Sequence, residues 1–225
     1  IASCLVGSEM CIRDRSWHGR TLATLAATGS DKARKGFEPL PTGFIQVAYN
    51  NIDAVRAAGD AEPRTAAVLL EVLQGEGGIR PSDIAYLQEV RRLCTERGWL
   101  LMIDEVQSGI GRTGKWFAHQ WADITPDVMT LAKGLAGGVP IGAMLAAGPA
   151  AGVFTPGSHG TTFGGGPLVC AAGLAVLDAL ESERLLDNAH TVGAYLKAAL
   201  GRALAGMDGV CLLYTSPSPR DKRQS

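Results

Sequence analysis

The chain has 225 residues, of which 46% are hydrophobic and 19% charged, with 21 basic and 22 acidic side chains. This composition is that of a globular protein, and the near balance of charge creates no field that would attract nucleic acid or an anionic membrane. No apolar run approaches the roughly 20 residues of a bilayer-spanning helix, and the five cysteines show no CxxC spacing. We therefore expect a cytoplasmic protein that acts on a small molecule.

The two ends of the chain match neither a helical nor a strand period. Back-translation of residues 5–14 gives a DNA sequence whose reverse complement, read one frame over, encodes residues 211–220. Both segments are typical of translated sequencing-library adapter, so we interpret residues 1–15 and 211–225 as non-native tails and leave them out of the fold prediction. On this interpretation residues 16–210 are an internal fragment, and the alternative is two ordinary termini.

Short apolar runs alternate with helical patterns between these ends. The alternation predicts an α/β domain with a mostly parallel sheet. One buried strand is expected over residues 66–73, where it leads into a loop rich in glycine. Further strands are predicted over residues 99–103, 128–131 and 143–147.

Three helices are predicted from the sequence. The first begins near residues 81–83, where Ser82 or Asp83 can cap it, and it ends at Gly98. Its apolar positions recur at three-residue steps, at Ile84, Leu87, Val90 and Leu93. Two amphipathic helices are expected over residues 167–180 and 184–205, the second leading towards another domain.

Lys133 stands at the end of an apolar strand, with a glycine directly behind it. A lysine attacks a carbonyl group only as the neutral amine, and burial lowers the pKa of a lysine enough to populate that form. The placement therefore suggests a nucleophilic lysine. The alternative is a surface lysine whose aliphatic stem covers apolar neighbours.

Asp104 ends the strand over residues 99–103, so its charge needs a partner that offsets the loss of solvation. A hydrogen-bond network, a metal ion or a cationic ring nitrogen would serve, and an acid here can equally bind Mg²⁺ or cap the next turn. Ligands of open parallel sheets bind beyond the carboxyl ends of the strands. Because Glu76, Asp104 and Lys133 all follow strands, we expect them at one site.

Two glycine-rich segments need separate interpretation. Residues 109–114 match the GxGxxG dinucleotide pattern, but they do not open a helix directly after the first strand, so we interpret the match as a decoy. Residues 158–166 combine hydroxyls and glycines before a helix, which suits either a phosphate-binding loop or a simple helix-entry turn. The four histidines have no zinc-site spacing.

Several motifs together resemble the class III aminotransferases, which depend on pyridoxal phosphate (PLP). The resemblance covers nearly all of residues 16–205. It rests on SWHGRT at 16–21, LQGEGG at 73–78, IDEVQSGIGRTG at 103–114, LAKG at 131–134 and GTTFGG at 160–165. Within the class, GFEPL at 36–40 and VPIGA at 139–143 look most like the acetylornithine aminotransferases, which also handle succinyldiaminopimelate in many bacteria.

The resemblance implies a fold and an assembly. The family has the fold-type I architecture and forms homodimers with active sites at the subunit interface. We would then assign residues 16–180 to a partial PLP-binding large domain, and residues 181–210 to a helix leading to a missing C-terminal domain. That domain would supply a carboxylate-binding arginine, and a phosphate loop would precede residue 16.

The resemblance also implies roles for individual residues. Lys133 would hold the cofactor covalently and move the proton during catalysis, and Asp104 would pair with the ring nitrogen. Gln107 would bind the ring hydroxyl, and Trp17 would stack on the ring, where the family usually has Phe or Tyr.

Three further residues would bind substrate or phosphate. Arg20 would clamp a substrate carboxylate, and Glu76 would act as a gate that pairs with the missing arginine. Thr162, with Thr161 beside it, would reach the phosphate of the neighbouring subunit's cofactor. Gly166 departs from an asparagine common in the family.

The implied reaction moves the terminal amino group of N-acetylornithine to 2-oxoglutarate in arginine biosynthesis. The alternatives are a class III enzyme acting on ornithine, 4-aminobutyrate or succinyldiaminopimelate, and a noncatalytic protein on the same scaffold. A nicotinamide oxidoreductase built on the glycine pattern is a third.

Overall fold

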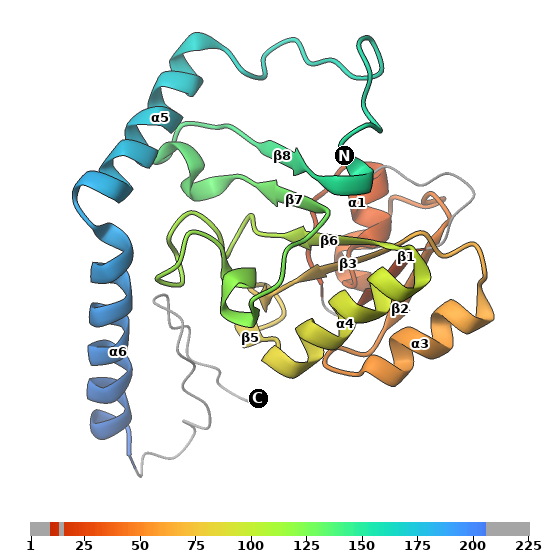
Figure 1. The fold of residues 1–225 in the computed structure, drawn as a ribbon, viewed down its shortest axis with the longest axis horizontal. Coiled ribbons are helices and arrows are strands. Elements are labelled where there is room, and N and C mark those ends of the chain that lie inside the picture. The colour runs from red at the N-terminus through yellow and green to blue at the C-terminus, as the bar shows by residue number, and fades with distance from the viewer. Residues whose placement is uncertain (1–9, 14–15, 206–225) are drawn as a thin grey trace.

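The structure is a computed structural model that describes residues 10–13 and 16–205 (Figure 1). Within those residues, no helix is both long enough and apolar enough to cross a membrane. The predicted α/β class is confirmed, because a mostly parallel sheet is flanked by helices.

The central sheet has six strands in the order β2-β1-β3-β6-β7-β8. All neighbouring pairs are parallel except β7 and β8, which are antiparallel. The strands are β1 (Met10–Arg13), β2 (Phe44–Val47), β3 (Ala67–Glu71), β6 (Leu100–Asp104), β7 (Val128–Leu131) and β8 (Ala143–Ala146). A separate antiparallel pair joins β4 (Leu73–Gln74) to β5 (Arg80–Pro81).

Strand β1 departs from the sequence prediction. We left residues 1–15 out of the fold, yet the backbone of Met10–Arg13 lies between β2 and β3 and pairs with both. Without a strand at this position, the edges of β2 and β3 that face each other would have unpaired backbone N–H and C=O groups. The other residues of both proposed tails lie outside the described residues, and their non-native origin stays a prediction.

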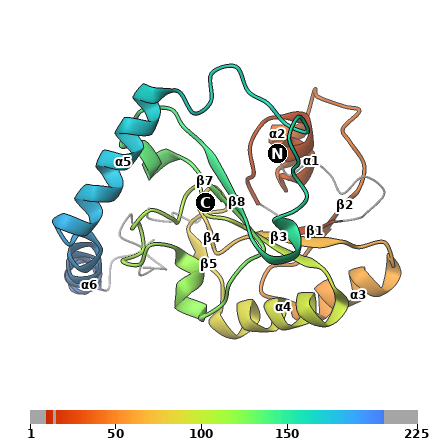
Figure 2. The ribbon, with the colours of Figure 1, turned by 45° about the horizontal axis from the view of Figure 1, so that its top comes forward.

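Helices cover both faces of the sheet (Figure 2). On one side lie α3 (Ile52–Ala61), α4 (Ile84–Arg97) and the short 3₁₀ helix η1 (Ala118–Ala122). On the other lie α1 (Leu22–Ala27) and α2 (Asp31–Arg34). The remaining helices are η2 (Lys133–Ala136), η3 (Gly148–Ala150), α5 (Pro167–Ser182) and α6 (Leu185–Ala203).

Helix α4 shows how well its sequence pattern predicts the structure. It ends at Gly98, which adopts the left-handed conformation at φ 67° that favours glycine. Leu87, Val90 and Leu93 are buried as expected, but Ile84 is 52% exposed. Neither predicted cap forms, because the Asp83 side chain makes no capping bond and the Ser82 hydroxyl donates to Tyr49 Oη at 2.6 Å.

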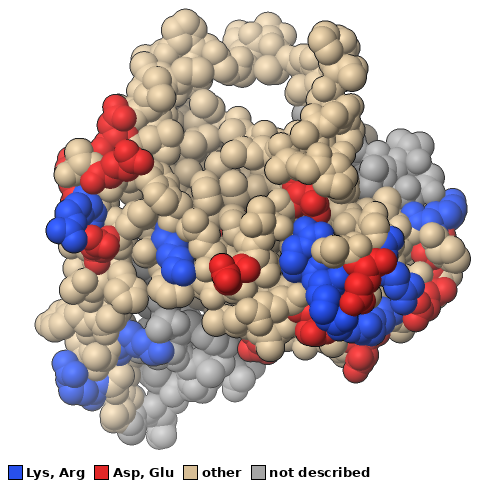
Figure 3. Space-filling view, viewed as in Figure 1, with Lys and Arg blue, Asp and Glu red and all other residues tan. Residues whose placement is uncertain are grey.

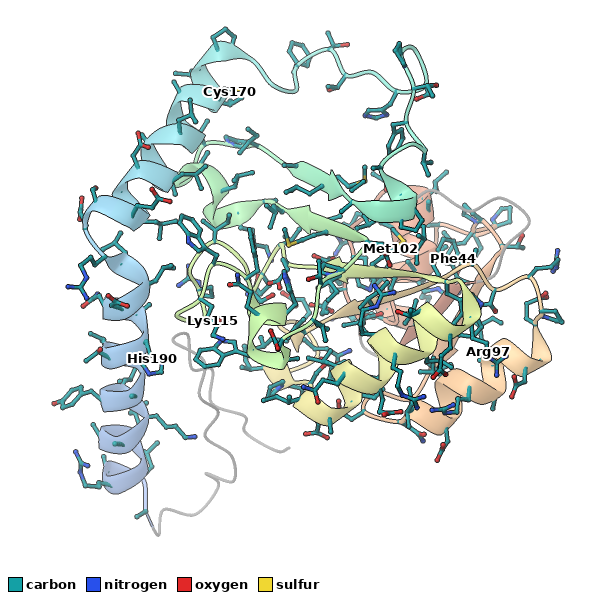
Figure 4. The ribbon with its side chains drawn as sticks, in the orientation of Figure 1. Phe44, Arg97, Met102, Lys115, Cys170 and His190 are labelled. Carbon is teal, nitrogen blue, oxygen red and sulfur yellow. The ribbon has the colours of Figure 1, made fainter. Side chains whose placement is uncertain are left out.

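Two apolar cores lie on opposite faces of the sheet. Consecutive strand residues alternate between them, so that Leu70 belongs to the core under α3 and α4 while Leu69 belongs to the other. Met102 lies in the second core, with Phe44 packed against it (Figure 4). This alternation explains why β3 and β6 are apolar at every position before their final acidic residue, rather than at every second position.

The outer faces of α3 and α4 carry most of the charge visible in Figure 3. Ion pairs there join Arg56 to Glu89 and Arg97 to Asp60.

Helix α6 has no buried residue and forms a long arm beside the domain (Figure 1). Its His190 stacks on Trp121 of η1, with ring centroids 5.9 Å apart (Figure 4).

Gly59 of α3 packs directly on the indole ring of the buried Trp99. A Cβ atom at residue 59 would lie 2.1 Å from Trp99 Cη2, so we expect Gly59→Ala to destabilise the fold by about 1–3 kcal/mol through overpacking. The matched control is Gly201→Ala in α6, where a Cβ atom meets nothing within 4 Å. Urea unfolding should show this control to be neutral or slightly stabilising. Equal effects of the two substitutions would contradict the packing argument.

Candidate active site

The candidate site lies where three neighbouring parallel strands end. Asp104 is the last residue of β6, Glu71 is the last residue of β3, and the two are partners in the strand register. Lys133 follows the end of β7 by two residues. The sequence prediction that Asp104 and Lys133 stand at this edge of the sheet agrees with these positions.

Asp104 is 8% exposed and uses both carboxylate oxygens. Its Oδ2 atom lies 2.8 Å from Nδ1 of His18, and its Oδ1 atom accepts from the backbone N–H of Val106 at 3.0 Å. An ionised carboxylate only accepts hydrogen bonds, so Nδ1 of His18 is the donor. Asp104 thus caps the following turn with one oxygen and meets an imidazole with the other. In residues 10–13 and 16–205, no group of three or more metal-binding side chains occurs.

Sequence reasoning missed His18 because it considered the histidines only as zinc ligands. The imidazole is 3% exposed, and in the described part of the chain its Nε2 atom has no hydrogen-bond partner. The two residues of the pair are 86 positions apart. The one sequence signal for the contact of His18 with Asp104 was the position of His18 next to Trp17, because hydrophobic periodicity does not link residues so far apart in the chain.

Lys133 has a strained backbone and an exposed side chain. Its φ of 46° lies in the left-handed region that non-glycine residues rarely adopt, as often occurs at functional sites. The Nζ atom donates to Oε1 of Gln107, so these two predicted site residues are in contact. The Lys133 side chain is exposed in this chain, because few elements surround the end of β7.

A pocket of 180 Å³ opens beside Lys133 and Gln107, and it is also lined by Arg112 and Thr113. A larger pocket of 390 Å³ is lined by α6 on one side and by residues of α4 and η1 on the other. Neither Lys133 nor Asp104 lines it. The smaller pocket is therefore the one that belongs to the candidate site.

Trp17 and Arg20 form a second cluster at the site. The guanidinium carbon of Arg20 lies 5.0 Å from the centroid of the Trp17 ring, which is a cation–π contact. Trp17 is fixed through its backbone N–H, which donates to Oε1 of Glu71 at 2.8 Å. Arg20 itself is exposed and open to an anionic ligand.

The structure does not bring Glu76 and Thr162 to the cluster around Asp104. Glu76 is exposed in the turn after β4. Thr162 is exposed in the long loop between β8 and α5, which arches away from the sheet in Figure 1. Within the described residues, neither side chain forms a hydrogen bond to the other predicted site residues, so both roles stay predictions. The glycine pattern at 109–114 lies in turns and opens no helix, which agrees with its interpretation as a decoy.

Two more buried acids support the site. Glu71 is 4% exposed, and burial raises its pKa to about 7, although the neighbouring His18 and the N–H of Trp17 act in the opposite direction. Glu105, directly after Asp104, accepts from the Ser108 hydroxyl at 2.6 Å and from the backbone N–H of His119 at 2.9 Å. Glu105 thereby fixes the loop that carries Gln107.

The comparisons with known proteins identify the class. The family model described as "Aminotransferase class-III" matches residues 9–210, and the chain belongs to this family. Over 88% of its length the chain is 83% identical to acetylornithine aminotransferase 1 of Bordetella pertussis, and 54% identical to the acetylornithine aminotransferase of Nitrosomonas europaea. The chain spans about half the length of these relatives, 50% and 51% respectively.

Solved structures agree with this assignment. The ornithine aminotransferase of Toxoplasma gondii superposes with a TM-score of 0.88 at 32% identity, over 94% of this chain and 51% of that one. A second structure of that enzyme, with partial occupancy of PLP at its active site, has a TM-score of 0.87 at the same identity, over 92% of this chain and 49% of that one. These similarities confirm the fold-type prediction.

The raised pKa of Glu71 predicts a pH-dependent stability. The folded state keeps the Glu71 proton up to about pH 7, so this contribution to stability is complete below the unfolded pKa and is lost as pH rises through 7. It amounts to roughly 3 kcal/mol at most. Glu71→Gln, measured by urea unfolding between pH 5 and 8, should flatten the dependence of the unfolding free energy on pH. An unchanged slope would contradict the assignment.

Proposed function

We propose that the protein carrying this chain is a PLP-dependent aminotransferase that moves the terminal amino group of N-acetylornithine to 2-oxoglutarate. The observation that carries the proposal is the pair of Asp104 and Lys133 at the ends of neighbouring strands. An acid and an amine in this arrangement are what the cofactor needs at its ring nitrogen and its aldehyde. The 83% identity to a relative named for acetylornithine favours this donor over ornithine, since the ornithine aminotransferase of Toxoplasma gondii is 32% identical.

The residues present fit the cofactor. Asp104, fixed by His18 and the Val106 N–H, can hold a cationic ring nitrogen with its charge. Gln107 is in reach of Lys133 and can bind the ring hydroxyl. Trp17 offers an indole for stacking on the ring, and Thr162 would bind the phosphate in a neighbouring subunit. When bound, PLP serves as an electron sink for the carbon that loses its proton.

Three side chains would then have separate roles in the reaction. Lys133 would hold the cofactor through its Nζ atom and, once that amine is free, would move the proton lost by the substrate carbon. Arg20 binds a substrate carboxylate with its planar guanidinium, for which the contact with Trp17 sets a starting position. Glu76 would act as a gate that pairs with a carboxylate-binding arginine of the C-terminal domain.

The proposal includes a cellular setting and an assembly. We infer that the complete protein is a homodimer of the cytoplasm that serves arginine biosynthesis. Residues 16–180 would be its partial PLP-binding large domain, and residues 181–210 would lead to the C-terminal domain. The 12 residues at 151–162 are exposed throughout, which supports a loop that reaches another subunit.

Lys133→Ala in the complete protein should abolish turnover and the absorbance band of covalently bound PLP, because it removes the amine that would hold the cofactor. The matched control is Lys115→Ala, which removes a lysine whose Nζ atom donates to the backbone carbonyl of Gln120. This control should keep near-normal activity with N-acetylornithine. Retained turnover in Lys133→Ala would overturn the proposal.

We expect the present chain, expressed alone, to be inactive and poorly soluble. Phe163, Leu168 and Tyr195 are 92%, 77% and 69% exposed, and exposed apolar surface on this scale promotes association. Size-exclusion chromatography and a transaminase assay test the expectation. A stable, active monomer would contradict it.

A further inference from the structure

Glu71 is a buried carboxyl group at the candidate site. It has no role in the reaction proposed for Lys133 and Asp104. It ends β3 and lies beside Asp104 in the strand register. The rest of β3 is apolar and buried, as are the residues that pack against it. Packing alone would be served by another apolar residue, and burying a carboxyl group costs free energy unless hydrogen bonds offset it.

Those hydrogen bonds go to two different segments of the site. Oε1 of Glu71 accepts from the backbone N–H of Trp17 at 2.8 Å, and Oε2 accepts from the backbone N–H of Gly75 at 3.5 Å. Trp17 carries the indole, and Gly75 directly precedes the gate residue Glu76. One side chain thus connects the segment before α1 with the turn after β4.

The turn at Gly75 is also in close contact with Gln107. A Cβ atom at residue 75 would lie 3.1 Å from Cγ of Gln107. Movement of Gly75 would therefore displace Gln107, which contacts Lys133. The placement of the indole, the gate and the amide depends on the same buried carboxyl group.

We propose that Glu71 is a positioning residue of the cofactor site, which holds the backbones of Trp17 and Gly75 so that Trp17 and Gln107 are correctly placed around Asp104 and the turn that carries Glu76 keeps its position. This inference rests on the proposed function. The proposed task of Glu71 is to hold the backbone, not to bind substrate or cofactor. The ionisable side chains whose charges act on it are His18 and Asp104, and the Tyr49 hydroxyl donates to its backbone carbonyl at 2.7 Å.

The test compares two variants of the complete protein by their PLP dissociation constants at pH 6 and pH 8. Glu71→Leu removes both acceptors and should weaken PLP binding at pH 8 by about tenfold or more. Glu71→Gln keeps one acceptor but turns an N–H donor towards the other backbone N–H. It should weaken binding about three- to tenfold at pH 8, and less at pH 6, where the wild-type carboxyl group is itself protonated.

Asp127→Asn is the matched control. Asp127 is also a largely buried carboxylate, and it accepts from the backbone N–H of Leu101 at 2.7 Å and from Arg91 at 2.8 Å, at the opposite end of the strands. This variant should lose stability but bind PLP within about twofold of wild type, since it leaves the candidate site intact. A loss of PLP affinity equal to that of Glu71→Gln would overturn the proposal.

Amide hydrogen exchange in the cofactor-free protein provides a readout that does not depend on the reaction. In Glu71→Gln the backbone amides of Trp17 and Gly75 should exchange faster than in the wild-type protein. In Asp127→Asn the backbone amide of Leu101 should exchange faster instead. If the wild-type protein binds no PLP, the proposed function fails. If it binds PLP and Glu71→Gln has wild-type affinity at both pH values, only the positioning role is overturned, and this outcome decides even if Glu71→Leu fails to fold.

Discussion

The buried carboxylate of Asp104 is the constraint on which the rest of the site depends. A charge at the end of an apolar strand loses its solvation, so the surrounding chain must supply partners that offset the cost. Here those partners are the imidazole of His18 and the backbone N–H of Val106. The first comes from the segment before α1 and the second from the turn after β6. The position of Asp104 therefore determines where both segments run.

The segment that carries His18 also carries Trp17 and Arg20, so three different functional groups lie within one short stretch of chain. His18 faces Asp104, the backbone of Trp17 is fixed by Glu71, and Arg20 lies over the indole ring. Each group has a separate tether, but all of them depend on the register between β3 and β6. A one-residue slip of that register would turn Glu71 away from Asp104 and separate the tethers.

Local patterns were sufficient to predict much of this arrangement. The strand at residues 128–131 and helix α4 follow from apolar periodicity and from Gly98, and Asp104 and Lys133 were predicted because each ends such a run. His18 and Glu71 could not be predicted in the same way, since their contacts join residues 86 and 54 positions apart. Helix α1 and strand β2 were missed as well, because they span only six and four residues. Helix α3 was also missed, although it has ten residues and Asn51 caps it. The exposure of Lys133 depends on which elements surround it, and no local pattern encodes that.

The two acids at the strand ends are paired in register, yet their surroundings differ. Two ionised carboxylates side by side would repel each other and would compete for the same neighbours. Asp104 faces the imidazole of His18, whereas the buried Glu71 carboxyl group accepts from the backbone N–H groups of Trp17 and Gly75. Burial raises the pKa of Glu71 to about 7, so near neutral pH a large fraction of this group is uncharged. The negative charge is thereby concentrated at Asp104, where a cationic ring nitrogen would need it, and Glu71 can hold the backbone without adding a full second charge to the site.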